Sequence, residues 1–119
     1  HMIRVPGGGR FEMRLPDGAA NPYLLQASIL AAGLEGIESK RDPGKPLDIN
    51  MYTHGHTVTA AKRLPLNLLD ALRALDGSAV LRGMLDDGFI DPYIKIKTAE
   101  WNSYCGHLTQ WERETTLDC

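Results

Sequence analysis

Two short stretches of alternating polar and apolar residues, joined by three consecutive glycines, restrict the start of this chain to one structure. Residues 2–6 alternate around a single charged side chain, Arg4, and residues 10–15 alternate without a break. A period of two residues is typical of a strand with one buried face. Glycine allows positive φ angles at no steric cost, so residues 7–9 favour a tight turn. The pattern therefore predicts a β-hairpin.

The predicted hairpin gathers charge on one face. Alternation places Arg10, Glu12 and Arg14 on the same face, with neighbours roughly 7 Å apart. The turn brings Arg4 close to that face. The opposite face, which we expect to pack against the core, carries Phe11, Met13 and Leu15.

From the residues alone, two interpretations of the charged face stay open. One is a solvent-facing strand whose charges pair with each other. The other is a phosphate and metal site, because arginine binds phosphate oxygens bidentately and a carboxylate between arginines can hold a divalent cation. The three glycines add little to the second interpretation, because no helix with a lysine follows them.

A nearly uniformly apolar helix is predicted after the hairpin. Asn21-Pro22 combines a capping residue with a proline suited to the first helical position, and Gly36 is suited to end the helix. A helix over residues 23–36 has no polar face, so we expect it to be buried. The rest of the chain can hardly cover it, which indicates partners outside these residues.

Further helices are predicted after a loop at residues 40–49. Asn67 is a cap for a short helix that ends at Gly77, a second short helix covers residues 78–85, and Asp91-Pro92 opens the longest helix. The apolar stripe of the longest helix, which we expect to lie in the core, consists of Tyr93, Ile94, Trp101, Tyr104, Leu108 and Trp111.

The fold class expected from these elements is α+β, an N-terminal β-hairpin followed by mainly α-helices, with no domain boundary inside residues 1–119. A chain of 119 residues can bury roughly two-thirds of its unfolded surface around one core. With 43% hydrophobic and 24% charged residues, the composition is that of a soluble globular protein.

Charge and hydropathy exclude several classes of function. A formal net charge of -2 gives no footprint for nucleic acid, and the longest apolar run is too short for a membrane span, so we expect a cytoplasmic location. We expect Cys105 and Cys119 to be reduced thiols. His54 and His56 invite comparison with a metal pair, but we expect them to be exposed loop residues, because no third ligand lies nearby in the sequence.

Several motifs, in one order, resemble the C-terminal part of the glutamine synthetase catalytic domain. The strand motifs are Ile3-Arg4-Val5-Pro6 and the run Arg10-Phe11-Glu12-Met13-Arg14-Leu15-Pro16-Asp17, and the helix motifs are Asn21-Pro22-Tyr23-Leu24 and Ala31-Ala32-Gly33-Leu34-Glu35-Gly36-Ile37. The resemblance continues more weakly to the end of the chain. The tail, residues 111–119, is similar to a divergent glutamine-synthetase-like branch.

The resemblance implies a reaction and roles for four residues. Glutamine synthetases use ATP to phosphorylate glutamate and then let ammonia displace the phosphate, with Mg2+ or Mn2+ on the phosphates. By this resemblance Arg4 and Arg10 face the ATP phosphates, and Arg14 holds the glutamate carboxylate or the transferring phosphoryl group. Glu12 matches a metal ligand. The implied assembly is a homo-oligomer of stacked rings.

The resemblance also implies what these residues lack. The family's Glu-x-Glu strand, metal-binding histidine and N-terminal β-grasp domain precede the region matched here, so we expect residues 1–119 alone to be inactive and to bind Mg-ATP weakly. His1-Met2 is either a cloning remnant or native sequence.

Regulation and substrate stay open in the sequence. Tyr52 falls where some bacterial members carry an adenylylated tyrosine, but the sequence after it differs, and an ordinary loop tyrosine is the alternative. The acceptor is ammonia or, in a γ-glutamylmethylamide synthetase, methylamine. A helical interaction module that has lost the chemistry is the alternative from another class.

Overall fold

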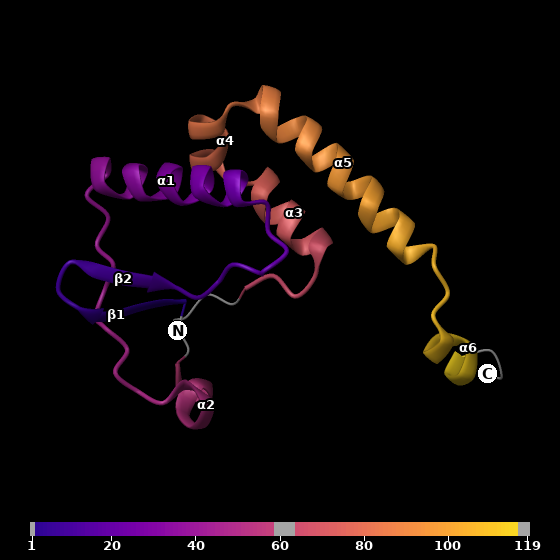
Figure 1. The fold of residues 1–119 in the computed structure, drawn as a ribbon, viewed down its shortest axis with the longest axis horizontal. Helices are drawn as coiled ribbons and strands as arrows, with labels where there is room; N and C mark the ends of the chain where they lie inside the picture. The colour runs from indigo at the N-terminus through magenta and orange to yellow at the C-terminus, as the bar shows by residue number, and fades with distance from the viewer. Residues whose placement is uncertain (1, 59–63, 117–119) are drawn as a thin grey trace. The chain divides into compact units, whose positions relative to one another are not determined.

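The computed structural model describes residues 2–58 and 64–116, and it confirms the α+β class. An antiparallel hairpin is followed by six α-helices and one 3-10 turn in these residues (Figure 1). The chain divides into two compact units, His1–Arg63 and Leu64–Cys119. The first holds the hairpin, α1 and α2, and the second holds α3 to α6.

The predicted hairpin is confirmed. Strand β1 covers Ile3–Gly7 and strand β2 covers Arg10–Met13, with Arg4 directly opposite Glu12. The register is interrupted between Arg4 and Gly7, where Pro6 has no N–H to donate to the ladder. Gly9 has a φ of 74°, the positive value that the turn requires.

Helix α1, Pro22–Glu38, begins as predicted. The Asn21 side chain accepts hydrogen bonds from the N–H groups of Tyr23 and Leu24. The predicted end at Gly36 is wrong, because the helix continues to Glu38 and ends with Lys40 in the left-handed region at φ 50°. The Lys40 and Arg41 N–H groups bond back to the carbonyls of Ile37 and Gly36, which satisfies the last turn.

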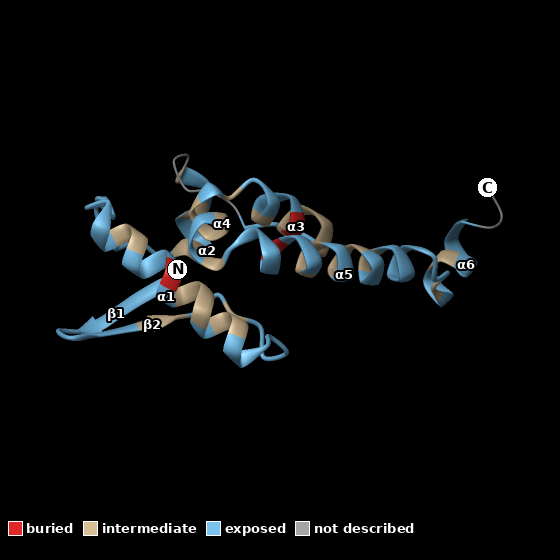
Figure 2. Cartoon of the chain, turned by 90° about the horizontal axis from the view of Figure 1, so that it is seen from above, coloured by how far each residue is buried: buried red, intermediate tan, exposed pale blue. Residues whose placement is uncertain are grey.

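Burial of α1 is far lower than expected. Ala31 is its one fully buried residue, whereas Tyr23, Leu30, Leu34 and Ile37 are exposed (Figure 2). The apolar face of the hairpin is likewise open at Phe11 and Leu15 and only half-buried at Met13. These faces have the composition of a protein interior but lack covering within the described residues, as the predicted need for outside partners implies.

The segment after α1 contains one short helix where the sequence predicted only loop. Helix α2 covers Met51–His54 and is followed by a 3-10 turn at Gly55–Thr57. The Asn50 side chain caps α2 by accepting from the Tyr52 N–H at 3.0 Å. Residues 40–49 form an irregular loop, as predicted.

The second unit is built from helices with side-chain caps. Helix α3 is Leu68–Asp76, capped by Asn67; α4 is Ala79–Leu85, capped by Ser78. Helix α5 is Asp87–Cys105 and α6 is Gln110–Thr116. The predicted start of α5 at Asp91 is wrong, because Asp86 caps the helix and Pro92 lies inside it. Pro92 is the sixth residue of α5, beyond the first turn, so the Gly88 carbonyl lacks its usual intrahelical donor.

Helices α3 and α4 both pack against α5, and the core of this unit is small. Leu72 is 4% exposed and Ile90 is 1% exposed. With Ala31 they are the buried hydrophobic residues of the described chain, so the expectation of one large core is wrong for these residues taken alone. The predicted stripe is interrupted, because α5 ends at Cys105 before Leu108 and Trp111.

The stripe is therefore only partly covered. Its first members, Tyr93, Ile94 and Trp101, are half-buried, and Tyr104, Leu108 and Trp111 are exposed.

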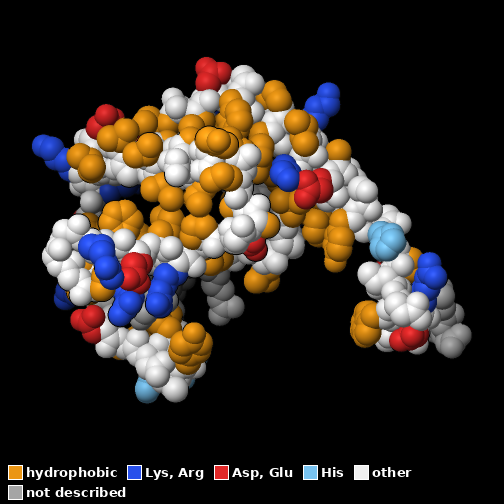
Figure 3. Space-filling view, viewed as in Figure 1, with side chains coloured by type: hydrophobic (Ala, Val, Ile, Leu, Met, Phe, Trp, Pro, Cys, Tyr) orange, Lys and Arg blue, Asp and Glu red, His pale blue; other side chains and the backbone are white. Residues whose placement is uncertain are grey.

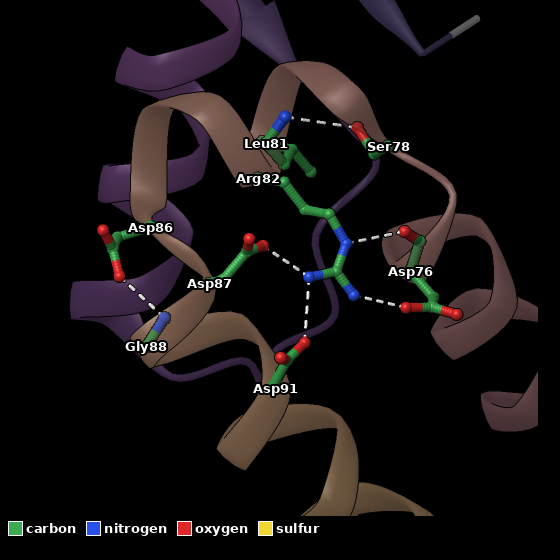
Figure 4. A network of polar contacts seen from close by, with 8 residues as sticks. All are labelled: Asp76, Ser78, Leu81, Arg82, Asp86, Asp87, Gly88 and Asp91. Carbon is green, nitrogen blue, oxygen red and sulfur yellow. Dashed lines mark hydrogen bonds and ion pairs between the residues drawn. The ribbon is translucent and has the colours of Figure 1, made fainter.

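One arginine joins the ends of three helices in the second unit. Arg82 on α4 pairs with Asp87 at 2.5 Å and Asp91 at 2.8 Å, and it also binds the Asp76 carboxylate (Figure 4). Its Nε donates to the Asp76 carbonyl at 2.8 Å. These bonds raise the pKa of Arg82, so the guanidinium stays charged.

Two further expectations concern the cysteines and membrane-spanning helices. Cys105 is a free thiol, as predicted, and it is exposed; Cys119 lies outside the described residues. Within the described ranges, no helix is long and apolar enough to cross a membrane.

Candidate functional site

The hairpin holds a cluster of charged side chains, which we call the hairpin cluster: Arg4, Arg10, Glu12 and Arg14. Arg4 and Glu12 are cross-strand partners, so their side chains leave the ribbon on the same face. The Arg4 Nη1 donates to Glu12 Oε2 at 3.2 Å. Figure 3 shows basic side chains gathered around an acidic one over the hairpin.

Arg10 completes a bracket around the same carboxylate. Its Nη2 donates to Glu12 Oε1 at 3.0 Å, so each carboxylate oxygen accepts from a different arginine. Residues two apart on a strand share a face, which explains why Arg10 and Glu12 meet. The side chains of Arg4 and Arg10 are 53% and 69% exposed, and that of Glu12 is 33% exposed. The bracket is therefore open to a ligand from solvent.

Arg14 lies one step beyond the end of β2. Its N–H donates to the Met2 carbonyl at 2.8 Å, which extends the ladder past the assigned strand. Its side chain is exposed, and it has no ion-pair partner among the described residues. Alternation keeps Arg14 on the face of Glu12, at the side opposite Arg10.

The hairpin cluster is suited to binding an anion together with a cation. Three guanidinium groups and one carboxylate give a local excess of two positive charges on an exposed ribbon. Guanidinium groups bind phosphate or carboxylate oxygens in pairs. Mg2+ in phosphate sites is held by one or two carboxylates together with phosphate oxygens and water, and Glu12 fits that role.

Comparison with known proteins assigns the chain to a family. Residues 1–116 match the family described as glutamine synthetase, catalytic domain. The chain belongs to the glutamine synthetase family. It is 64% identical over 118 residues to a glutamine synthetase of Rhizobium leguminosarum bv. phaseoli, which covers 99% of this chain and 27% of that relative.

Other family members match over the same region. A glutamine synthetase of Rhizobium meliloti (strain 1021) is 60% identical over 118 residues, again 99% of this chain and 27% of the relative. A glutamate–methylamine ligase of Methyloversatilis universalis is 40% identical over 120 residues, which is 98% of this chain and 27% of that relative. The chain thus spans about a quarter of the length of these relatives.

The histidines lie apart from any metal constellation in the described part of the chain. His54 and His56 are exposed, as predicted, although they lie in helical turns. The His54 Nδ1 is 2.7 Å from the Thr53 hydroxyl. No three His, Cys, Asp or Glu residues in the described ranges group to hold a metal ion.

Tyr52 is fully exposed on α2, and its N–H bonds to Asn50.

Two features near the site were not predicted from the sequence. The first is a clamp at the end of α1, where Arg41 donates from Nε and Nη2 to the Glu35 carboxylate at 2.7 and 2.6 Å. The Arg41 guanidinium, with the Ser39 hydroxyl, holds the pKa of Glu35 below its usual range. The second is a cavity of about 840 Å3 between β1 and residues 43–49.

Proposed function

We propose that residues 1–119 are the C-terminal portion of the catalytic domain of an ATP-dependent glutamate–ammonia ligase. The observation that carries the proposal is the Glu12 carboxylate bracketed by Arg4 and Arg10 on an exposed hairpin, in a chain that belongs to the glutamine synthetase family. The reaction proposed for the whole enzyme forms glutamine through γ-glutamyl phosphate. ATP, glutamate and ammonia are its substrates.

The proposed roles follow from the chemistry of phosphoryl transfer, which asks mainly for positioning and for positive charge where negative charge develops. Arg4 and Arg10 bind phosphate oxygens of ATP and keep them on the face of the hairpin. Both residues can release Glu12 for this, because their ion pairs with it are exposed and weak. Exchange of a carboxylate for a phosphate leaves each guanidinium with an anionic partner.

Arg14 serves the second substrate in this proposal. With no ion pair in the described structure, its guanidinium is available for the carboxylate of glutamate or for the transferring phosphoryl group. Glu12 supplies one oxygen ligand to a divalent cation. When bound, Mg2+ or Mn2+ neutralises phosphate charge and orients the phosphates. Residues outside this chain complete the metal and nucleotide sites.

Ammonia is favoured over methylamine as the acceptor. The two glutamine synthetases are 64% and 60% identical to this chain, whereas the glutamate–methylamine ligase is 40% identical. We also propose that the enzyme is a cytoplasmic homo-oligomer of stacked rings. The uncovered apolar faces of α1 and the hairpin support packing against further protein.

The test is ligase activity of the full-length enzyme that contains this chain. Purified enzyme is incubated with Mg-ATP and glutamate, and with ammonia or methylamine at equal concentrations. We expect ADP and glutamine to form with ammonia, and much slower product formation with methylamine. Faster turnover with methylamine would reassign the acceptor, and no ATP-dependent product with either amine would favour the non-catalytic interaction module. Residues 1–119 alone are expected to be inactive and to show no tight Mg-ATP binding by calorimetry.

A further inference from the structure

The cavity beside β1 adjoins the hairpin cluster through Arg4. One wall is the β1 segment Ile3, Arg4 and Val5, and the other is formed by residues 43–49. Arg4 belongs both to this wall and to the bracket around Glu12. A volume of about 840 Å3 lies within the range of roughly 300 to 1,000 Å3 seen for small-molecule sites. The cavity therefore borders the hairpin cluster at Arg4.

The charges in the cavity are few and unpaired with each other. Its lining is mainly apolar, and its charged residues are Arg4, Lys45 and Asp48. Lys45 and Asp48 are exposed, and neither has an ion-pair partner among the described residues. The side toward Arg4 and Lys45 favours an anion.

The loop that carries Lys45 is held by hydrogen bonds where it leaves α1. The Glu35–Arg41 clamp and the Arg41 N–H bond to the Gly36 carbonyl set the direction in which the chain leaves α1. Asp42 then accepts from the Gly44 N–H at 2.9 Å, and Gly44 has a φ of 78°, which side chains rarely adopt. Lys45 is thus presented from an ordered turn.

We propose that Lys45 is a further phosphate-binding residue, and that the cavity between β1 and residues 43–49 takes part of the nucleotide's phosphate chain beyond the hairpin cluster. The inference rests on the proposed function. Arg4 is the shared contact, and the Lys45 ammonium supplies charge from the opposite wall. Lysine acts as a point charge without the planar fork of arginine, so it tolerates several phosphate positions.

The test is equilibrium binding of Mg-ATP to the full-length enzyme, measured by calorimetry for wild type and three variants. Lys45→Gln removes the proposed charge, Lys45→Arg keeps it, and Lys40→Gln is the matched control. Lys40 is an exposed lysine that does not line the cavity. Adenosine, which has no phosphates, is the second probe. Thermal unfolding of each variant reports whether the fold is retained.

We expect Lys45→Gln to weaken Mg-ATP binding about tenfold, the effect of one charge-assisted hydrogen bond. Lys45→Arg should restore most of the affinity, Lys40→Gln should have none of the effect, and adenosine binding should not change. Equal Mg-ATP affinity in wild type and Lys45→Gln would overturn the proposal, and so would an equal loss of adenosine binding.

Absence of Mg-ATP binding to the wild type would overturn the proposal as well. An enzyme that binds Mg-ATP with the expected Lys45 dependence but makes no glutamine would contradict the proposed function alone.

Discussion

Ile90 on α5 is the most buried large side chain of the described residues. Removing one methylene group from it therefore tests the packing of α3 on α5. Ile90→Val deletes that group from a site that is 1% exposed. Such a deletion in a packed interior destabilises by about 0.5 to 1.5 kcal/mol, through lost transfer free energy and the cavity left behind. Ile96→Val makes the same change on the same helix at a side chain that is 66% exposed. There we expect a change within about 0.5 kcal/mol.

The assay is amide hydrogen exchange of the 119-residue chain, read by mass spectrometry over α3 and α5. A loss of 0.5 to 1.5 kcal/mol corresponds to exchange faster by roughly two- to tenfold. Ile90→Val should produce this acceleration in both helices, because they pack on each other. Ile96→Val should change exchange by less than about twofold. Equal effects of the two substitutions, or an effect of Ile90→Val confined to α5, would refute the packing described here.

Three further outcomes are expected. In the full-length enzyme, Arg14→Ala should lower glutamate-dependent turnover by orders of magnitude, and near-normal steady-state rates would refute its substrate role. The pKa of Glu35 is lowered, so its ion pair with Arg41 stabilises the fold at any pH above the ordinary glutamate pKa of 4.5, and this stabilisation is lost as the pH falls through the lowered pKa. Arg41→Gln should raise the pKa of Glu35 in an NMR titration, and an unchanged titration curve would contradict the clamp. Arg82→Met removes ion pairs to three aspartates, whereas Arg73→Met removes one exposed pair. Arg82→Met should therefore accelerate amide hydrogen exchange across α4 and the start of α5 more than Arg73→Met does. Equal acceleration would show that Arg82 does not hold the three helix ends together.

Local chemistry was sufficient to predict much of the fold. The hairpin follows from alternation and glycines, and the helix starts at Asn21, Asn67 and Ser78 follow from side chains that cap their own backbone. The ends of helices were harder to predict, because a glycine does not always end a helix. Gly36 remains helical, and Lys40 takes the positive φ that ends α1.

The sequence did not predict two features, the start of α5, which is local, and the exposure of the apolar faces, which is long-range. The start of α5 at Asp87 depends on the Asp86 cap, which outweighed the signal of Asp91-Pro92. Exposure of α1 and of the hairpin's apolar face depends on which protein surfaces cover them, and an apolar pattern does not specify the partner. The bracket of Arg4 and Arg10 around Glu12 was predictable from alternation, because two residues share one strand and the third lies opposite.

The cavity beside β1, in contrast, was not predictable from the sequence. Its walls are a strand and a loop some forty residues apart, and no pattern in the sequence links Lys45 to Arg4.

The central claim is that Glu12 holds a divalent cation on the hairpin face. The most direct measurement is Mn2+ binding by electron paramagnetic resonance to the full-length enzyme, comparing wild type, Glu12→Gln and Glu38→Gln. Glu38 is an exposed carboxylate at the end of α1 and serves as the control. Glu12→Gln should leave the enzyme folded, because the two exposed ion pairs that it removes contribute at most about 1 kcal/mol each to the free energy of unfolding. We predict that Glu12→Gln weakens Mn2+ binding at least about tenfold while Glu38→Gln matches wild type. Mn2+ binding that is identical in all three proteins would contradict the account.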